Sequence, residues 1–232
     1  MIQNSKSEYL SGLGQLVVYA KICFTRLEFT GGMVVSNHNG GGSIGDTVVV
    51  FGAGPIGLTV AQWARAMGAS QIIIFDLIPE KLAMARRLGF AHAYDVREDD
   101  PGDAVASLTQ GQGAHVCVEA AGVPATFVQA LSSARRGGRV VVLGNPSADV
   151  TLPAALISQA MRREVEIFGV WNSQFSATGD DDDWHAVLDA VAAGKIQLEP
   201  LISHRVPLDG ALDALVMMRD QSEFFSKVLI HP

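Results

Sequence analysis

Cysteine is scarce in this chain of 232 residues, which contains only Cys23 and Cys117, far apart in the sequence. Two distant cysteines exclude the dense disulfide framework that stabilises many small secreted domains. We therefore expect a protein of the reducing cytoplasm.

Positive charge and long apolar runs are scarce as well. The 17 lysines and arginines are outnumbered by 24 acidic residues, and the net charge of -7 argues against nucleic acid as a main partner. No apolar run approaches the roughly 20 residues that span a bilayer, so we expect no membrane segment. The short apolar patch at residues 16–20 has no convincing cleavage site, so we also expect no signal peptide.

A glycine-rich turn is the most informative feature that the chain does contain. An apolar, β-rich run, Thr47–Phe51, is followed by Gly52, Gly54 and Gly57 and by a helix-like stretch at residues 56–67. Gly52 permits the turn, Gly54 lets a pyrophosphate approach the backbone, and Gly57 lets the helix pack on the strand. The N–H groups at the helix start would point at the phosphates. The pattern predicts a dinucleotide site, although such a turn can also serve only to let backbone segments approach each other.

Asp76 indicates which dinucleotide is bound. A second buried strand at residues 70–75 ends beside this aspartate, about 20 residues beyond the glycines, where a carboxylate binds the diol of the adenosine ribose. A carboxylate there repels the 2′-phosphate of NADP, so we expect NAD. The alternative is a Rossmann-like sheet whose site is empty.

Strand and helix signals alternate from Asp46 onward, which predicts an α/β fold with a doubly wound, six-stranded parallel sheet of the Rossmann type. The remaining strands are expected at residues 91–95, 114–119, 139–143 and 165–170. Helices are expected at residues 79–88, 103–109, 124–134, 156–163 and 183–193. A strand at 202–206, a helix at 209–219 and a strand at 227–231 follow.

Three regions are expected. Residues 1–45 form an unassigned leader with a glycine-rich linker, residues 46–200 an NAD-binding domain, and residues 201–232 a C-terminal tail. The leader shows no strand and helix pattern of its own, and we assign no fold to it.

Several short motifs follow the glycine turn. In chain order they are Met67-Gly-Ala, Lys81-Leu-Ala, Glu119-Ala-Ala-Gly-Val-Pro, Gly138-Arg-Val-Val-Val-Leu-Gly, Arg162-Arg-Glu-Val-Glu-Ile-Phe-Gly, Glu199-Pro-Leu-Ile-Ser-His-Arg and Lys227-Val-Leu-Ile-His-Pro. Together they resemble the cofactor-binding half of the zinc-dependent medium-chain alcohol and polyol dehydrogenases, over about four fifths of the chain. The galactitol-1-phosphate 5-dehydrogenase and sorbitol dehydrogenase branches are the most similar. In that family the tail packs on the N-terminal catalytic domain, of which residues 1–45 would be an incomplete remnant.

The resemblance implies a cofactor site in the loops that follow the strands. Its residues are Gly52, Gly54, Pro55, Ile56 and Gly57 at the pyrophosphate, Asp76 and Lys81 at the adenosine ribose, Ala121 and Gly122 after the fourth strand, and Leu143, Gly144, Asn145, Val170 and Trp171 toward the nicotinamide. Lys81 can also be read as a solvated helix residue, and Trp171 as a packing or subunit-contact aromatic.

The resemblance does not extend to the residues that bind the catalytic zinc. In the family an N-terminal domain supplies the zinc ligands, a cysteine, a Gly-His-Glu segment and a further acid. The 51 residues before Gly52 contain neither that segment nor a cysteine cluster, and we interpret Cys23 and His38 as incidental. We therefore expect no catalytic or metal-binding residue in this chain, and zinc only in the full-length family.

Two other polar features also have plain explanations. The acidic run at residues 180–183 precedes a helix, whose positive end it would cap, rather than forming a metal site. His204 and Arg205 are interpreted as packing or interdomain residues rather than as acid-base groups.

The sequence thus predicts an NAD-dependent oxidoreductase that transfers a hydride between NAD and a small-molecule alcohol, either a polyol or a polyol phosphate. The alternative is a truncated, non-catalytic NAD-binding module. An S-adenosylmethionine methyltransferase fits less well because of the sixth strand and the tail. The strand at residues 165–170 has no proline or lysine to protect an exposed edge, which predicts a homodimer or higher oligomer.

Overall fold

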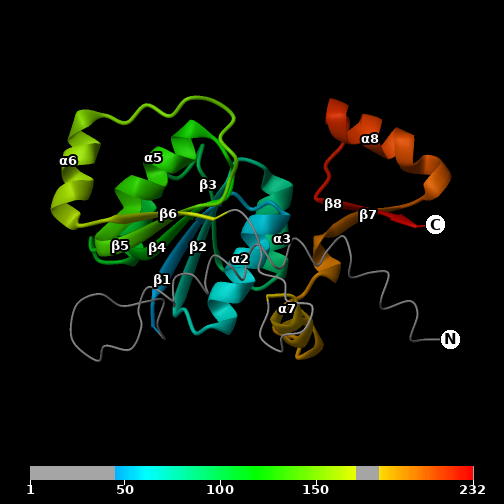
Figure 1. The fold of residues 1–232 in the computed structure, drawn as a ribbon, viewed down its shortest axis with the longest axis horizontal. Coiled ribbons are helices and arrows are strands. Elements are labelled where there is room, and N and C mark those ends of the chain that lie inside the picture. Colours follow the sequence, from blue (N-terminus) through cyan, green and yellow to red (C-terminus); the bar gives the residue numbers. More distant parts are fainter. Residues whose placement is uncertain (1–44, 171–182, 232) are drawn as a thin grey trace.

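The computed structural model describes residues 45–170 and 183–231, and its centre is a six-stranded parallel sheet (Figure 1). The strand order is β3-β2-β1-β4-β5-β6, which confirms the predicted doubly wound sheet. The expected remnant of a catalytic domain falls almost wholly in residues 1–44, outside the described residues. The strands are β1 (Thr47–Phe51), β2 (Gln71–Asp76), β3 (His92–Asp95), β4 (Ala114–Glu119), β5 (Ala134–Val142) and β6 (Glu166–Gly169).

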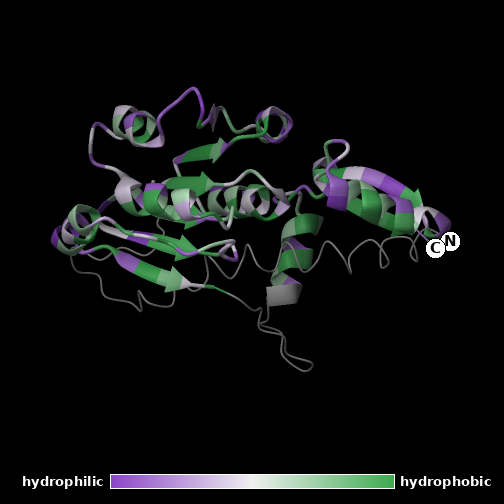
Figure 2. Ribbon diagram, turned by 90° about the horizontal axis from the view of Figure 1, so that it is seen from above, coloured by the Kyte–Doolittle hydropathy of each residue, from purple (hydrophilic) through white to green (hydrophobic). Residues whose placement is uncertain are grey.

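Helices cover both faces of this sheet, because alternate residues of each buried strand point to opposite sides. Val48 and Val50 of β1 pack with one group of helices, and Val49 and Phe51 pack with the other. In Figure 2 the strands of the sheet combine hydrophobic stretches, drawn green, with hydrophilic ones, drawn purple. The first group holds α2 (Pro55–Ala66), α3 (Pro79–Arg87) and α7 (Asp183–Ala192), and the second holds α4 (Pro101–Leu108), α5 (Pro124–Ser133) and α6 (Ala154–Arg163).

The C-terminal tail forms a small βαβ unit of its own. Its two strands, β7 (Ile202–Pro207) and β8 (Lys227–His231), pair in parallel, and α8 (Ala211–Asp220) connects them. The unit lies beside the main sheet, near α3 (Figure 1), where the Ser226 hydroxyl is 3.8 Å from the sulfur of Met84. The strands of the tail are thus confirmed, whereas its contact with a catalytic domain stays a prediction.

Most element boundaries lie within two residues of the sequence prediction, and the start of β5 differs by more. β5 begins at Ala134 instead of residue 139, immediately after α5, with a register shift against β4 between Ala114 and Val116. The helix expected from residue 103 begins at Pro101, because the Asp100 carboxylate caps it by accepting a 3.0 Å hydrogen bond from the Asp103 N–H.

Within the described residues no helix is long and apolar enough to cross a membrane.

A histidine joins β1 and β4 at the amino edge of the sheet. The Thr47 N–H donates to Nδ1 of His115 at 3.0 Å, so Nδ1 carries no proton, and Nε2 lies 3.3 Å from the Asp46 carboxylate. Burial lowers the pKa of His115, against the opposing effect of Asp46, and the charge of Arg135 lowers it further. The fold therefore holds this imidazole in its neutral form.

This arrangement predicts that His115 contributes stability that acid removes. The folded state binds a proton at His115 less readily than the unfolded chain, whose histidine titrates near pH 6.5. The contribution is complete above that pH and is lost as the pH falls toward the lower pKa of the folded state, at up to about 1.4 kcal/mol per pH unit. The unfolding free energy can be measured with urea at about pH 7.5 and about pH 5.5. It should decrease more between these two pH values in the unmutated chain than in His115→Asn.

His92→Asn, which leaves the bond from Thr47 to His115 intact, is the matched control and should keep the acid-induced loss. An equal loss in the unmutated chain and in His115→Asn would contradict the assignment.

Candidate functional site

The carboxyl edge of the sheet brings most of the predicted cofactor residues together. The strand order reverses between β1 and β4, the point at which ligands bind in open α/β sheets. The turns after β1, β2, β4 and β5 all open at this edge. They carry the predicted glycines, Asp76, the pair Ala121–Gly122 and the stretch from Leu143 to Asn145.

The three glycines of the turn after β1 are required for different reasons. Gly52 has a φ of +104°, which side chains rarely adopt, and a Cβ on Gly57 would lie 1.8 Å from the carbonyl oxygen of Gly52. Both are therefore demanded by the fold. Gly54 has an ordinary φ of -68°, and a Cβ there would meet no protein atom within 4 Å. No part of the described chain accounts for a glycine at position 54, so the space in front of it is available to a ligand.

The start of α2 is suited to an anion. Gly54 is the N-cap residue, Pro55 follows, no side chain caps the helix, and its first turn holds no acidic residue. The Leu58 N–H bonds the Gly54 carbonyl at 2.9 Å, which leaves the N–H groups of Ile56 and Gly57 ahead of the first helical bond. Such groups, together with the helix dipole, favour a phosphate.

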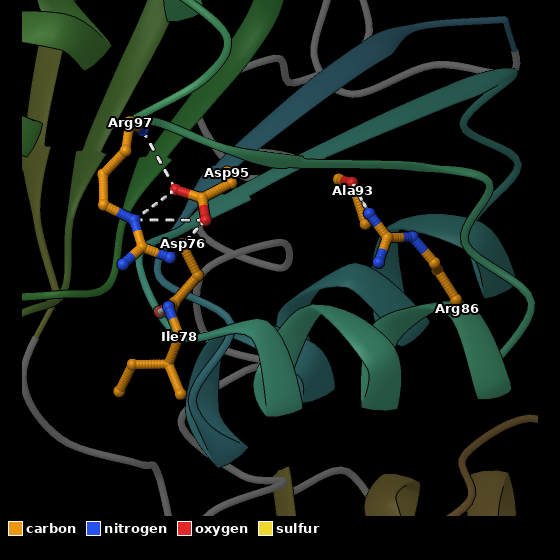
Figure 3. Close-up of polar contacts among 6 residues, drawn as sticks. All are labelled: Asp76, Ile78, Arg86, Ala93, Asp95 and Arg97. Carbon is orange, nitrogen blue, oxygen red and sulfur yellow. Dashed lines mark hydrogen bonds and ion pairs between the residues drawn. The ribbon is translucent and has the colours of Figure 1, made fainter.

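Asp76 is tied to the glycine turn. One carboxylate oxygen accepts the N–H of Ala53 at 2.6 Å, and the other accepts the N–H of Ile78 at 2.9 Å, as Figure 3 shows for Ile78. These bonds hold the carboxylate between the turn after β1 and the start of α3. Lys81 lies in the first turn of α3, half exposed, with its N–H bonded to the Ile78 carbonyl.

Glu119, which the sequence prediction missed, organises the loop after β4. Its side chain is buried at 2% exposure, and Oε1 accepts three hydrogen bonds, from the N–H of Ala121 at 2.9 Å, the N–H of Gly122 at 2.8 Å and the hydroxyl of Thr126 at 2.7 Å. A buried carboxylate with three donors is a rigid anchor. The signals in the sequence were an acidic residue at the end of a mostly apolar strand and its position at the start of the Glu119-Ala-Ala-Gly-Val-Pro motif.

The loops after β4 and β5 touch through their backbones. A Cβ on Gly122, whose φ is +71°, would lie 2.4 Å from the Asn145 carbonyl oxygen, and one on Gly144 would lie 2.3 Å from the Gly122 nitrogen. The Gly122 carbonyl also accepts the N–H of Ser147 at 2.9 Å. Both glycines are thus needed for packing, which fixes the shape of the backbone at this part of the carboxyl edge.

The remaining predicted cofactor residues differ in what can be said of them. Leu143 is buried, and the N–H of Val170 bonds the Val142 carbonyl at 3.0 Å, which places Val170 beside β5. Asn145 is exposed. Trp171 lies outside the described residues.

Apolar side chains at the same edge were also missed. Leu77 is 53% exposed and Val123 is 40% exposed, and they follow β2 and β4 respectively. Large exposed apolar groups at such an edge can pack against a flat aromatic ring such as adenine. The signal in the sequence was a leucine directly after Asp76.

Metal ligands do not gather within residues 45–170 and 183–231, where no group of three His, Cys, Asp or Glu side chains could hold an ion. Cys117 is fully buried in β4, and burial raises the pKa of its thiol well above the usual value. Within the tail, His204 contacts the Ser203 hydroxyl at 2.8 Å and Glu223 at 3.5 Å. Cys23, His38 and most of the acidic run at residues 180–183 lie outside the described residues.

Comparison with known proteins identifies relatives among dehydrogenases. A family model described as zinc-binding dehydrogenase matches residues 55–193. The chain is 30% identical to a sorbitol dehydrogenase from Bacillus subtilis (strain 168) over 189 residues, covering 81% of this chain and 51% of the relative. It is 32% identical to an L-threonine 3-dehydrogenase of the same organism, covering 81% and 52%. The chain thus spans about half the length of the curated relatives it matches.

The similar solved structures are also dehydrogenases. Galactitol-1-phosphate dehydrogenase from Escherichia coli superposes with a TM-score of 0.79 at 25% identity, over 94% of this chain and 59% of that one. A zinc-binding dehydrogenase from Sinorhizobium meliloti 1021, solved with NADP bound, superposes with a TM-score of 0.72 at 26% identity, over 94% and 58%. These findings confirm the family and the fold predicted from the motifs.

The unequal roles of the glycines predict opposite phenotypes for two substitutions. Gly54→Val should fold with a stability within about 1 kcal/mol of the unmutated chain, because a Cβ at residue 54 has no protein atom within 4 Å, but should lose detectable dinucleotide binding. Gly57→Ala should lower the unfolding free energy by about 1–3 kcal/mol, because its methyl group overlaps the Gly52 carbonyl. Circular dichroism melts and titration calorimetry with NAD measure the two effects.

Full NAD affinity in Gly54→Val would show that the space in front of residue 54 is not used by the cofactor.

Proposed function

Because the chain belongs to the zinc-binding dehydrogenase family, we propose that it binds NAD along the carboxyl edge of its sheet as part of an oxidoreductase. The reaction would be hydride transfer between NAD and a polyol or polyol phosphate. The observation that carries this proposal is Gly54, whose missing side chain leaves open space directly in front of the uncapped start of α2.

The residues of the edge fit NAD part by part. The N–H groups of Ile56 and Gly57 would bind the pyrophosphate, and Asp76 would accept hydrogen bonds from the hydroxyls of the adenosine ribose. Lys81, in the first turn of α3, would contact the same ribose. Leu77 and Val123 would enclose the adenine. The backbone from Leu143 to Asn145 would face the carboxamide end.

The choice of NAD over NADP rests on Asp76. One solved relative contains NADP, so family membership alone does not decide the cofactor. In this chain the Asp76 carboxylate is held by two backbone N–H groups at the end of β2. A 2′-phosphate at that position would meet a fixed negative charge, whereas a ribose hydroxyl would donate a hydrogen bond to it.

The chemistry would come from the cofactor and from the orientation that the protein imposes. Bound NAD supplies nicotinamide C4 as the hydride acceptor. The loops after β4 and β5, fixed by Glu119 and by the contact between Gly122 and Asn145, would hold the nicotinamide in one orientation. The described residues do not fit a zinc site, and no step of this proposal runs through zinc.

The substrate class is inferred from relatives. The sorbitol and galactitol-1-phosphate dehydrogenases favour a polyol, while the threonine dehydrogenase is equally similar in sequence.

The second candidate function is NAD binding without turnover, which is favoured by the lack of a metal-binding group among the described residues. Incubation of the chain with NAD, zinc and a panel of polyols separates the two, because only the oxidoreductase forms NADH.

We also propose a dimer formed through β6. This strand is the outer strand of the sheet, and Ile167 is 50% exposed. Since the Val170 N–H bonds β5, the alternation of a strand turns the backbone groups of Ile167 toward the open edge. Two copies could join these edges about a two-fold axis and satisfy the exposed groups.

The cofactor proposal predicts that Asp76→Ala weakens NAD binding and relaxes the discrimination against NADP. Loss of hydrogen bonds to a charged group costs about 1.5–3 kcal/mol, or roughly ten- to a hundredfold in affinity. Titration calorimetry with both dinucleotides measures it. Glu80→Ala, which removes a nearby exposed charge on α3, is the control and should change neither affinity. Equal affinity of the unmutated chain for NAD and NADP would refute the proposal.

The dimer proposal predicts that Ile167→Pro yields a monomer. Proline removes the outward N–H of residue 167 but leaves the bonds of β6 to β5 in place, so the fold should persist. Light scattering at micromolar concentration gives the mass, and Ile167→Val, which keeps the N–H, should remain dimeric. A monomeric unmutated chain would rule the interface out.

A further inference from the structure

The ends of β2 and β3 place two carboxylates side by side. Asp76 and Asp95 are register partners on these neighbouring strands. The N–H of Val96, the residue after Asp95, donates to the Asp76 carbonyl at 3.3 Å, which holds the two strand ends together. Asp95 therefore borders the place where the proposed adenosine ribose lies.

An arginine is bound to the second carboxylate. Nε of Arg97 donates to both Asp95 oxygens, at 2.9 and 3.2 Å, an Nη of the same guanidinium donates to Oδ2, and the backbone N–H of Arg97 donates to Oδ1 at 3.0 Å (Figure 3). Asp95 is 12% exposed and Arg97 is 57% exposed. The pairing lowers the pKa of Asp95 to about 2, so this carboxylate stays charged at neutral pH.

An arginine at this edge is the group that would otherwise favour NADP. Guanidinium groups bind phosphate through two parallel hydrogen bonds, and sites for the 2′-phosphate use an arginine near the end of the second strand. In this chain Asp95 compensates the positive charge of Arg97. The edge of the guanidinium that carries Nε already donates its hydrogen bonds to the Asp95 carboxylate.

We propose that Asp95 is a second determinant of cofactor choice, which disfavours NADP by holding Arg97 away from the 2′-phosphate. This inference rests on the proposed function. Asp76 acts on the phosphate directly by repulsion, and Asp95 acts indirectly by retaining the cation. The two carboxylates are therefore coupled. When only Asp95 is replaced, Arg97 is released, but Asp76 still repels the 2′-phosphate. When only Asp76 is replaced, the repulsion is gone, but Asp95 still holds Arg97 away from the 2′-phosphate.

A double-mutant cycle tests the coupling. NADP affinity is measured by titration calorimetry for the full chain and for Asp76→Ala, Asp95→Asn and the double variant. We expect the double variant to bind NADP at least about tenfold more tightly than the product of the two single effects predicts. Adding Arg97→Gln to the double variant should abolish that gain, because the released cation is then missing. NAD affinity of Asp95→Asn should stay within about threefold of the unmutated value.

Two results would overturn the inference. Effects of Asp76→Ala and Asp95→Asn on NADP binding that simply multiply would show that Asp95 is not coupled to Asp76 in cofactor choice, and a gain that survives Arg97→Gln would show that the arginine is not its source. Thermal melts confirm folding, and Asp95→Ser gives the same prediction should Asp95→Asn unfold. An unmutated chain that binds no NAD would contradict the proposed function as well, whereas NAD binding with multiplicative NADP effects contradicts only the role of Asp95.

Discussion

The close contact between the start of α2 and the end of β1 is the constraint on which the rest of the site depends. The helix can begin so near the strand only because Gly57 has no side chain in front of the Gly52 carbonyl. That contact directs the N–H groups of the first turn toward the carboxyl edge of the sheet. It also sets the position of the Ala53 N–H, which holds the carboxylate of Asp76. One backbone contact thus positions both the N–H groups proposed to bind the phosphates and the carboxylate proposed to bind the ribose.

A buried carboxylate performs the corresponding task on the other side of the strand-order reversal. Glu119 ends β4, and its side chain gathers the N–H groups of Ala121 and Gly122, while its carbonyl accepts the N–H groups of Leu143 and Gly144, both at 2.9 Å. The loops after β4 and β5 are therefore connected through one residue. This part of the carboxyl edge is built from fixed backbone, which would suit the proposed binding of a long, flexible dinucleotide in one conformation.

The sequence predicted the parts of this structure that follow from local pattern. Buried strands such as Thr47–Phe51 and the glycine spacing are readable because strand burial and tight turns each restrict residue type locally. The start of β5 was missed because Ala134 to Gly138 carry two arginines and two glycines, and only pairing with β4 makes them a strand. The pair Asp95–Arg97 was missed because its place beside Asp76 arises only when β3 pairs with β2. Glu119 was missed although its partners are only two, three and seven residues further along the chain, because an acid at the end of a strand is usually solvated and nothing in the local pattern shows that this one is buried.

Hydrogen–deuterium exchange of the full chain, with and without NAD, tests the central claim most directly, because that claim concerns particular backbone N–H groups. The account predicts that NAD slows exchange at the first turn of α2 and in the loops after β4 and β5, and leaves β7, α8 and β8 unchanged. Slowing confined to the β7–β8 unit, or no change at the start of α2 at saturating NAD, would contradict it.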